Sequence, residues 1–155
     1  MNSFNSLGSS QPEVVLYIDN TPQWEEQLLD VPALIDRNGN HWRKILTIFS
    51  KLCCDDDWRE YRDKNLLHDA QQINFSEALV PSAQIHIFSG KACWQRFGIT
   101  NEMLADMRSI PCDRVFYHQS ATRGLMLYTP YFDYRQFPNV LIAQVRAIMK
   151  AAPIV

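Results

Sequence analysis

Residues 125–139, with the sequence LMLYTPYFDYRQFPN, gather the side chains best suited to holding a ligand. An apolar run gives way there to aromatic residues that alternate with an acid, a base and an amide. The ring of Tyr131 offers a flat face for stacking, while Asp133 and Arg135 offer an acceptor and a bidentate donor. A structural interpretation is equally open, because aromatic side chains can seal a sheet edge and Asp133 can pair with Arg135 to close the loop.

A second polar segment, DNTP at residues 19–22, follows a short apolar run. At the end of a buried strand, Asp19 and Asn20 could position a water molecule or bond to the edge of a base. The alternative is an Asx turn, in which these side chains bond to nearby backbone groups and help to start a helix.

A third segment, SGK at residues 89–91, follows another apolar run and suggests a phosphate-binding loop. The nucleotide-hydrolysing signature GxxxxGK, followed by Ser or Thr, is not met, because Ile85 replaces its first glycine and Ala92 its hydroxyl residue. A weaker role survives, since Gly90 at a helix start lets N–H groups approach an anion and Lys91 adds charge. The alternative is that Gly90 only permits a tight turn from strand to helix.

His118, at the end of a further predicted strand, could act as an acid, a base or a ligand contact, or be only a satisfied polar group. The four histidines and four cysteines show no spacing that supplies metal ligands from one element, so we expect no metal site and no cofactor. The adjacent Cys53 and Cys54 cannot form an ordinary disulfide with each other, and we expect reduced, mostly buried thiols.

The bulk composition suits a single domain, with 155 residues and 46% hydrophobic content. Residues 1–12 are rich in Ser, Asn and Gly and are predicted to be a flexible tail, which leaves residues 13–155 as one α/β domain. No apolar run approaches the roughly 18 to 20 residues that span a membrane, and no signal peptide is visible, so we expect a cytoplasmic protein. Residues 1–80 hold 7 basic and 13 acidic residues and residues 81–155 hold 8 and 4, which favours the later half for any polyanion contact.

The elements that must position these segments follow from the spacing of apolar residues. Short, buried, β-branched runs predict strands, and apolar residues at i, i+3, i+4 and i+7 predict amphipathic helices. The predicted strands are residues 14–18, 83–88, 114–118 and 125–128, and the clearest predicted helices are residues 40–53 and a last helix from Pro138 or Asn139 to 152. The predicted helix caps are Thr21 with Pro22 in the first turn, Asn40, Asp56 or Asp57, and Thr100.

Short strands separated by amphipathic helices predict an α/β fold, a three-layer sandwich with a mostly parallel sheet of about four strands between helices. Ligands of such open sheets bind beyond the carboxyl ends of the strands. Residues 19–22, 89–91 and 129–139 each follow a predicted strand, so parallel strands would bring all three segments to one edge. The predicted ligand-binding residues are Asp19, Asn20, Gly90, Lys91, His118, Tyr131, Asp133 and Arg135.

The strings that carry these segments resemble known motifs. SGKACWQRF after a strand resembles the strand-Gly-Lys-x-Ala helix of the uracil-DNA glycosylase superfamily, and VLYIDNTP resembles its first motif, a strand followed by Gly-x-Asp/Asn-Pro. YTPYFDYRQFPN falls where that superfamily has a His-Pro-Ser-Pro-like loop before its last helix. The chain is also similar to a small uncharacterised bacterial domain family that carries strings like GKACW and PYFDYRQFPN, and this resemblance implies no activity.

The glycosylase resemblance implies a parallel four-stranded sheet between helices, with a cleft at the strand ends. It places Asp19 or Asn20 at the water-positioning residue, and residues 131–135 at the base pocket and minor-groove loop. The sequence departs from the motifs, since no Gly precedes Asp19, Thr21 separates Asn20 from Pro22, and the third loop has no histidine. A glycosylase must flip a base and grip phosphates, and a chain of net charge -2 with these changes is expected to lack that activity.

Three functions stay open at this point. We expect a strand-end cleft that binds a nucleobase, a nucleotide, a nucleic acid or another small anion, with or without catalysis. One alternative is a protein-interaction module that presents the aromatic loop, residues 129–139, to a protein partner as an exposed anchor. The other alternative is a divergent DNA glycosylase.

Overall fold

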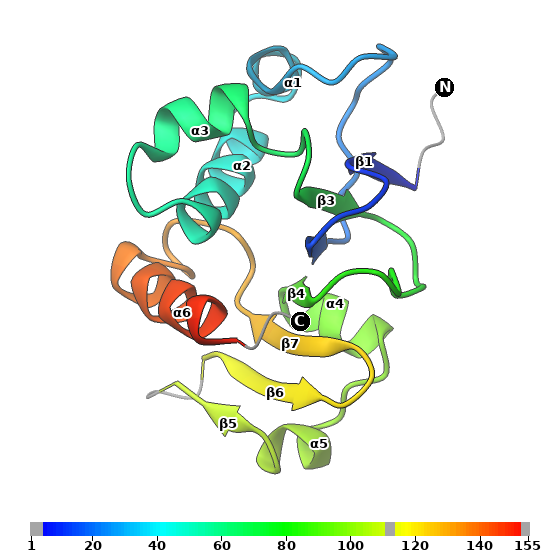
Figure 1. Cartoon of the computed structure of the whole chain (residues 1–155), viewed down its shortest axis with the longest axis vertical. Coiled ribbons are helices and arrows are strands. Elements are labelled where there is room, and N and C mark those ends of the chain that lie inside the picture. The colour runs from blue at the N-terminus through cyan, green and yellow to red at the C-terminus, as the bar shows by residue number, and fades with distance from the viewer. Residues whose placement is uncertain (1–4, 111–113, 153–155) are drawn as a thin grey trace.

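The structure, a computed structural model, describes residues 5–110 and 114–152. In those ranges seven strands form one sheet, and six helices accompany it (Figure 1). The helices are α1 (Val31–Asn38), α2 (Asn40–Cys53), α3 (Trp58–Lys64), α4 (Lys91–Arg96), α5 (Asn101–Ala105) and α6 (Asn139–Ala151). The strands are β1 (Ser6–Gly8), β2 (Val14–Tyr17), β3 (Gln71–Asn74), β4 (Ile85–Ser89), β5 (Arg108–Ser109), β6 (Phe116–Ser120) and β7 (Gly124–Thr129).

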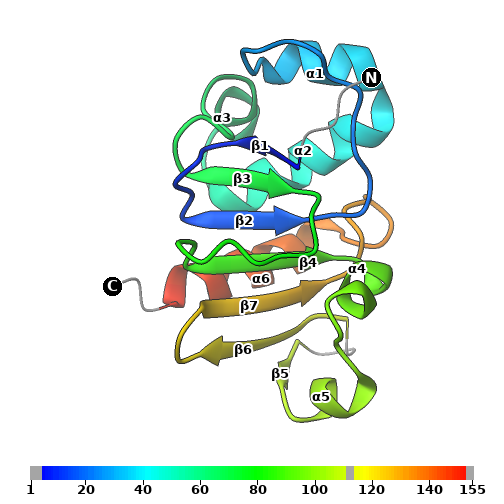
Figure 2. The ribbon, with the colours of Figure 1, turned by 90° about the vertical axis from the view of Figure 1, so that its right-hand side faces the viewer.

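One sheet joins the seven strands in the order β1-β3-β2-β4-β7-β6-β5. Its centre is a parallel block, because β2 pairs in parallel with both β3 and β4, and β4 does so with β7. The outer strands β1, β6 and β5 each pair antiparallel with their inner neighbour. The strands of the parallel block therefore end at one common edge, where Tyr17 lies opposite Phe88 and Ser89 lies opposite Thr129 (Figure 2).

The α/β class is confirmed, but the predicted sheet of about four mostly parallel strands is wrong, since the sheet is mixed and has seven strands. β1 lies within residues 1–12, the segment predicted to be a flexible tail.

Strand β3 was not predicted from the sequence, because its residues, QQIN, are polar. Its side chains are nevertheless buried and bonded: Gln71 Oε1 accepts from the Leu67 N–H, and Gln72 Nε2 donates to the Ser9 carbonyl. Hydrogen bonding makes burial of a polar strand tolerable, and a search for apolar runs overlooks it.

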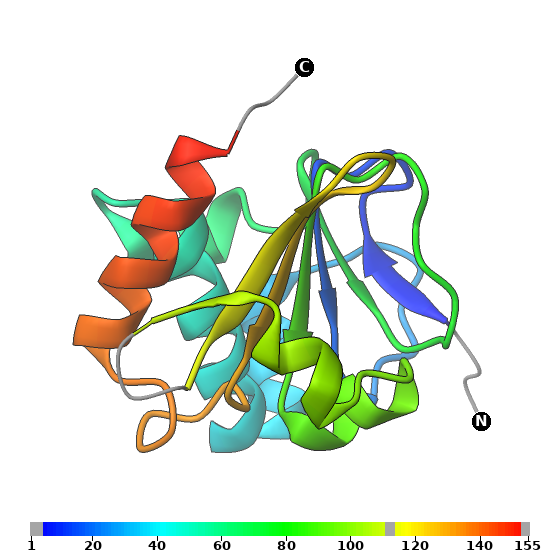
Figure 3. The same ribbon diagram turned by 90° about the horizontal axis from the view of Figure 1, so that it is seen from below.

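Both faces of the sheet are covered by helices (Figure 3). On one face, α1, α2 and α6 form the larger core, in which Phe49 and Val145 pack with Leu16. On the other face, α4 and the chain around it form a smaller core, in which Trp94 packs with Tyr17. Leu16 and Tyr17 are neighbours on β2 and enter opposite cores, because successive side chains of a strand alternate between its faces.

The helix predicted to start at residues 21–22 does not form, and residues 18–30 contain no helix. The Asn38 side chain holds this segment as a loop, because it accepts a hydrogen bond from the Gln23 N–H at 2.7 Å and donates to the Gln23 carbonyl at 2.9 Å. Helix α1 begins after Asp30, whose side chain caps it. A side-chain clasp between distant residues therefore overrides a local helix-start signal.

Of the other predicted helix caps, two are confirmed and one is wrong. The side chains of Asp57 and Thr100 are confirmed as caps, since each accepts a hydrogen bond from a backbone N–H three residues later. Asn40 is the first residue of α2 rather than its cap, which is Gly39. No helix of the described ranges is long and apolar enough to cross a membrane. The free cysteines there are Cys53, Cys54 and Cys93, and Cys112 lies outside the described residues.

Candidate functional site

A cleft of about 740 Å³ lies beyond the carboxyl ends of β2, β4 and β7. Each of the three segments singled out in the sequence contributes to its walls: Asp19 and Asn20 follow β2, Gly90 and Lys91 follow β4, and Tyr131 follows β7. The structure therefore brings five of the eight candidate residues together in one cleft. The remaining lining residues are Ser89, Ala92, Trp94, Arg114, Pro130 and Gln136.

Tyr131 connects the strand ends to the start of α2. Its hydroxyl oxygen accepts a hydrogen bond from Asn20 Nδ2 at 2.6 Å and lies 2.7 Å from His41 Nε2. Because Asn20 donates through that nitrogen, the Tyr131 hydroxyl proton is left to bond to His41 when Nε2 is the unprotonated ring nitrogen. Burial is the main cause that raises the pKa of Tyr131, and the hydrogen bond from Asn20 opposes it. The hydroxyl therefore stays protonated near neutral pH.

Gly90 lets the Tyr131 ring lie against the end of β4. Its φ is +89°, a conformation that residues with side chains rarely adopt, and a Cβ at this position would lie 3.2 Å from Tyr131 Cδ1. The Gly90 N–H is already bonded to the Thr129 carbonyl at 2.9 Å. Gly90 thus serves the tight turn and the close packing of Tyr131, and its own N–H is not available to an anion.

Trp94 ties the ends of β4 and β7 together beneath the cleft. Its indole N–H donates to the carbonyls of Phe88 at 2.9 Å and Thr129 at 3.1 Å. The neighbouring Cys93 thiol donates to the Tyr17 carbonyl, and burial raises the pKa of this thiol to about 12. A thiol of that pKa is not a nucleophile at neutral pH, so the string GKACW has structural roles at its Gly, Cys and Trp positions.

The carboxylate of Asp19 is paired. Arg96 Nε lies 2.7 Å from Asp19 Oδ1, and the same guanidinium donates to the Ser76 carbonyl at 2.7 Å. The Arg96 side chain is 20% exposed, and these two contacts fix it between the end of β2 and the chain after β3. Arg96 therefore compensates the negative charge that Asp19 brings to the cleft.

Lys91 and Arg114 supply the positive charges of the cleft. Lys91 is exposed at the first position of α4, whereas Arg114 is half-buried and donates to the Gln136 carbonyl. Neither side chain forms an ion pair with any residue in the described ranges. Lys91 thus lines the cleft from α4, and Arg114 lines it from the connection between β5 and β6.

Asp133 and Arg135 do not line the cleft, and they do not pair through their side chains. Asp133 Oδ2 accepts from the Arg135 backbone N–H at 3.1 Å, and Asp133 Oδ1 lies 3.3 Å from Lys44 Nζ. Burial acts to raise the pKa of Asp133, but the hydrogen bonds from the Arg135 N–H and from Lys44 outweigh it and lower that pKa. Asp133 therefore closes the loop through the Arg135 backbone N–H and joins it to α2 through Lys44, in place of the expected side-chain pair with Arg135.

The aromatic side chains of this loop divide into inner and outer groups. Phe132 and Phe137 are fully buried and pack edge to face, with ring centroids 5.4 Å apart. Tyr134 is 45% exposed, and Lys44 Nζ lies 5.6 Å from its ring centroid. Most of the aromatic loop therefore extends the larger core, and Tyr131 is the ring that reaches the cleft.

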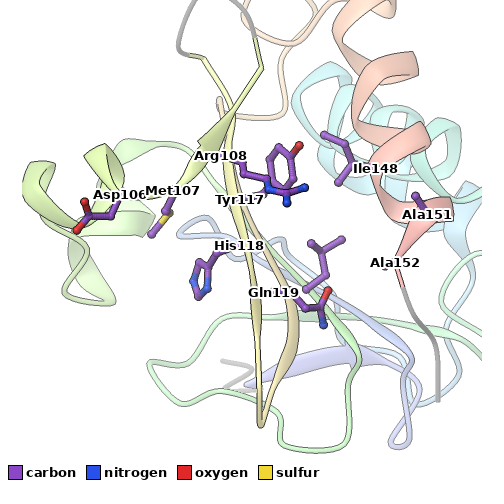
Figure 4. Close-up of a pocket in the computed structure, with 10 residues that line it drawn as sticks. Asp106, Met107, Arg108, Tyr117, His118, Gln119, Ile148, Ala151 and Ala152 are labelled. Carbon is purple, nitrogen blue, oxygen red and sulfur yellow. The ribbon is translucent and has the colours of Figure 1, made fainter.

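His118 lies away from the cleft, because β6 runs antiparallel to β7 and does not end at the shared edge. His118 lines a separate hollow of about 500 Å³ around the outer strands (Figure 4). Figure 4 shows His118 with Met107 on one side of β6, and Tyr117 and Ile148 on the other side. Burial lowers the pKa of His118, whose ring stacks on Tyr128 with centroids 6.0 Å apart.

Sequence reasoning did not foresee three charged or titratable residues at this site. His41 reaches Tyr131 across 90 positions of chain, Arg96 reaches Asp19 across 77, and Arg114 lies beside Gln136. Each contact depends on how helices and strands pack rather than on a local motif. The string SGKACWQRF gave no signal for Arg96, because about one and a half helical turns separate it from Lys91 and place it on another side of the helix.

The fold and the site together define an α/β protein with a mixed sheet between two helical layers and a polar cleft at the carboxyl ends of its parallel strands. Residues 5–150 match the family described as a family of unknown function, DUF6942, and the chain therefore belongs to that family. No curated protein and no solved structure matches the chain. Family membership assigns no activity, so the function must be argued from the cleft.

Proposed function

We propose that this protein binds a nucleobase, a nucleotide or another small anion in the strand-end cleft. The observation that carries the proposal is the joint lining of one cleft by residues that follow three parallel strands. Open α/β sheets bind ligands at this location, and a volume of about 740 Å³ lies in the range of small-molecule sites.

The lining groups suit such a ligand. Asn20 keeps its amide oxygen as an acceptor, because its nitrogen is the atom bonded to Tyr131. Ser89 Oγ accepts from the Phe132 N–H at 3.0 Å and keeps its hydroxyl proton for donation. Pro130 adds apolar surface, and Lys91 adds positive charge. Hydrogen-bonding groups, apolar surface and charge thus meet in one cleft.

A thermal-shift screen with nucleobases, nucleotides, inorganic anions and short single-stranded DNA tests the proposal, because a ligand that binds only the folded state raises Tm. A ligand found in this way should lose affinity for the Asn20→Ala and Lys91→Gln variants. Lys64→Gln is the matched control, since Lys64 is exposed on α3. The proposal fails if no ligand of these classes shifts Tm, or if the control loses as much affinity as the cleft variants.

A divergent DNA glycosylase is the second candidate, and the order of the parallel strands, β3-β2-β4-β7, supports it. This arrangement fits what the resemblance to the uracil-DNA glycosylase superfamily implies, and Asn20 lies in the cleft where a water-positioning residue is expected. The Asn20 amide nitrogen, however, is engaged by Tyr131. Release of uracil from single-stranded DNA by the wild type but not by Asn20→Ala would support this candidate, and no release by the wild type would remove it without affecting ligand binding.

The protein-interaction alternative stays a prediction. It would depend on Tyr134, the exposed ring of the loop, because Phe132 and Phe137 are buried. Tyr134→Ala should then disrupt association with a protein partner while Lys91→Gln should not.

A further inference from the structure

We infer that the ligand of the cleft carries a phosphate monoester, which Lys91 and Arg114 bind as a dianion. This inference rests on the proposed ligand-binding function and specifies its ligand class. It follows from the charges of the side chains that line the cleft, from their pairing, and from a comparison with two other hollows of the molecule.

Three charged side chains line the cleft: Asp19, Lys91 and Arg114. The carboxylate of Asp19 is compensated by Arg96, whose Nε lies 2.7 Å away. Lys91 and Arg114 have no carboxylate partner within the described ranges. Two positive charges are therefore left for a ligand.

A phosphate monoester carries a charge of about -1.5 to -2 at pH 7, whereas a carboxylate carries a single charge, so the monoester matches two cations better. Arg114 uses one terminal nitrogen for the Gln136 carbonyl, which leaves other guanidinium donors for phosphate oxygens. Lys91 is exposed and can reorient its ammonium toward an entering anion. Lys91 begins α4, whereas Arg114 lies in the connection between β5 and β6, so the two cations approach a ligand from different parts of the chain.

Two of the other hollows that contain cations are also lined by acids, and a third contains a single cation, Lys51. The hollow beside Trp58 is lined by Lys51 and Arg146, but also by Asp55 and Asp56. The hollow of Figure 4 is likewise lined by one cation, Arg108, and one acid, Asp106. An anion entering either would meet carboxylates as well as cations. In the strand-end cleft the single carboxylate is neutralised by an arginine that does not itself line the cleft.

Arg96 then acts as a positioning residue that sets the charge of the cleft through Asp19. Arg96→Gln should weaken phosphate binding about fivefold, because an uncompensated carboxylate is left beside the ligand. Asp19→Asn should strengthen it by a similar factor, because the charge of Arg96 is then uncompensated. Combining the two substitutions should recover much of the affinity lost in Arg96→Gln, which a loss of folding in that variant would not allow.

The experiment is isothermal titration calorimetry of the full chain with inorganic phosphate, adenosine 5′-monophosphate, adenosine and benzoate. We expect the two phosphates to bind more tightly than adenosine and benzoate, more weakly at higher salt, and at least about tenfold more weakly to Lys91→Gln and Arg114→Gln. Lys64→Gln, with an exposed lysine on α3, is the matched control, and thermal unfolding of each variant verifies its fold.

The outcomes separate the two proposals. If adenosine binds as tightly as adenosine 5′-monophosphate, or benzoate as tightly as inorganic phosphate, the phosphate inference is wrong and the ligand-binding function stands. Equal affinity of phosphate for Lys91→Gln and Lys64→Gln also overturns the inference. If none of the four probes binds and the wider screen of nucleobases, nucleotides and anions is empty, both proposals fail.

Discussion

The two faces of the sheet are stabilised in different ways. The face under α1, α2 and α6 is filled mainly by aliphatic side chains, among which lie the rings of Phe49, Phe132 and Phe137. The face under α4 carries a row of stacked rings, in which Tyr17 lies between His86 and Phe88, and Phe88 stacks on Tyr128 with centroids 4.9 Å apart. These rings follow the sheet register, since Tyr17, Phe88 and Tyr128 lie opposite one another on β2, β4 and β7.

The second face also depends on the direction of a few hydrogen bonds. His86 is fully buried; its Nδ1 lies 2.7 Å from the Tyr17 hydroxyl, and its Nε2 lies 3.0 Å from the Arg123 carbonyl. The Arg123 carbonyl can only accept, so Nε2 carries the proton and Nδ1 accepts from Tyr17. The Tyr17 oxygen in turn accepts from the Val80 N–H at 3.0 Å. The first face thus depends on the amount of apolar surface, and the second on an ordered chain of donors and acceptors.

The largest expected effect is on the aliphatic face. Phe49→Ala should lower the free energy of unfolding by about 3–5 kcal/mol, because it removes a fully buried ring and leaves a cavity. Urea unfolding measures this change. Val140→Ala on α6 is the control, since Val140 is 73% exposed and should change stability by no more than about 0.5 kcal/mol. Equal losses in the two variants would show that the core has been wrongly located.

On the aromatic face, Tyr17→Phe should cost about 1–3 kcal/mol, because His86 Nδ1 and the Val80 N–H both lose their buried partner. Tyr128→Phe provides the comparison at the next ring of the row. Its hydroxyl lies 3.4 Å from His118, a long contact that should matter less. A smaller loss for Tyr17→Phe than for Tyr128→Phe would reject the hydrogen-bond account of this face.

Acid should lower the free energy of unfolding through His86, the buried histidine of the aromatic face. Burial is the main cause that lowers the pKa of His86, so the unfolded chain binds a proton at this residue more readily than the folded protein does. Its contribution to stability is therefore complete above the unfolded pKa of about 6.5 and is lost as the pH falls through the folded value. The free energy of unfolding, measured from about pH 7.5 to about pH 5, should fall less steeply in His86→Gln. An unchanged slope would assign the pH dependence to other groups, such as His118.

The smallest stability effect is expected at the cleft. Tyr131→Phe removes contacts to Asn20 and His41, both of which are exposed and can bond to water instead, so the cost should be no more than about 1 kcal/mol. Ligand affinity, in contrast, should fall if the hydroxyl orients Asn20. A stability loss as large as that of Tyr17→Phe would place Tyr131 among the structural residues rather than the ligand-binding ones.

The contrast between the two faces also explains what the sequence could predict of the fold. Apolar periodicity located α2 and the buried strands β2, β4 and β7, because these elements are stabilised by burial of apolar surface. It did not locate β3, whose buried amides depend on partners such as Ser9 and Leu67. The cap residues Thr21 and Pro22 also predicted a helix start, where the hydrogen bonds of Asn38 hold a loop. Elements stabilised by long-range hydrogen bonds leave little local signal.

The same division applies to the candidate site. Residues that directly follow parallel strands could be predicted to meet, and Asp19, Gly90 and Tyr131 do so. His118 does not line the cleft with them, because β6 runs antiparallel to β7. That direction follows from the pairing of the whole sheet and not from the sequence around His118. Arg96 contacts Asp19 from α4. This contact could be identified only from the packed structure, since no spacing in the chain relates the two residues.

The bifurcated hydrogen bond of Trp94 has a kinetic consequence. One indole N–H joins the Phe88 and Thr129 carbonyls, and the Gly90 N–H bonds to Thr129 as well, so the base of the cleft is braced before any ligand arrives. A preorganised base spares the ligand the entropic cost of ordering the chain. Association should therefore be a single, concentration-dependent phase without a slow isomerisation step, and affinity differences among ligands should reside in their dissociation rates.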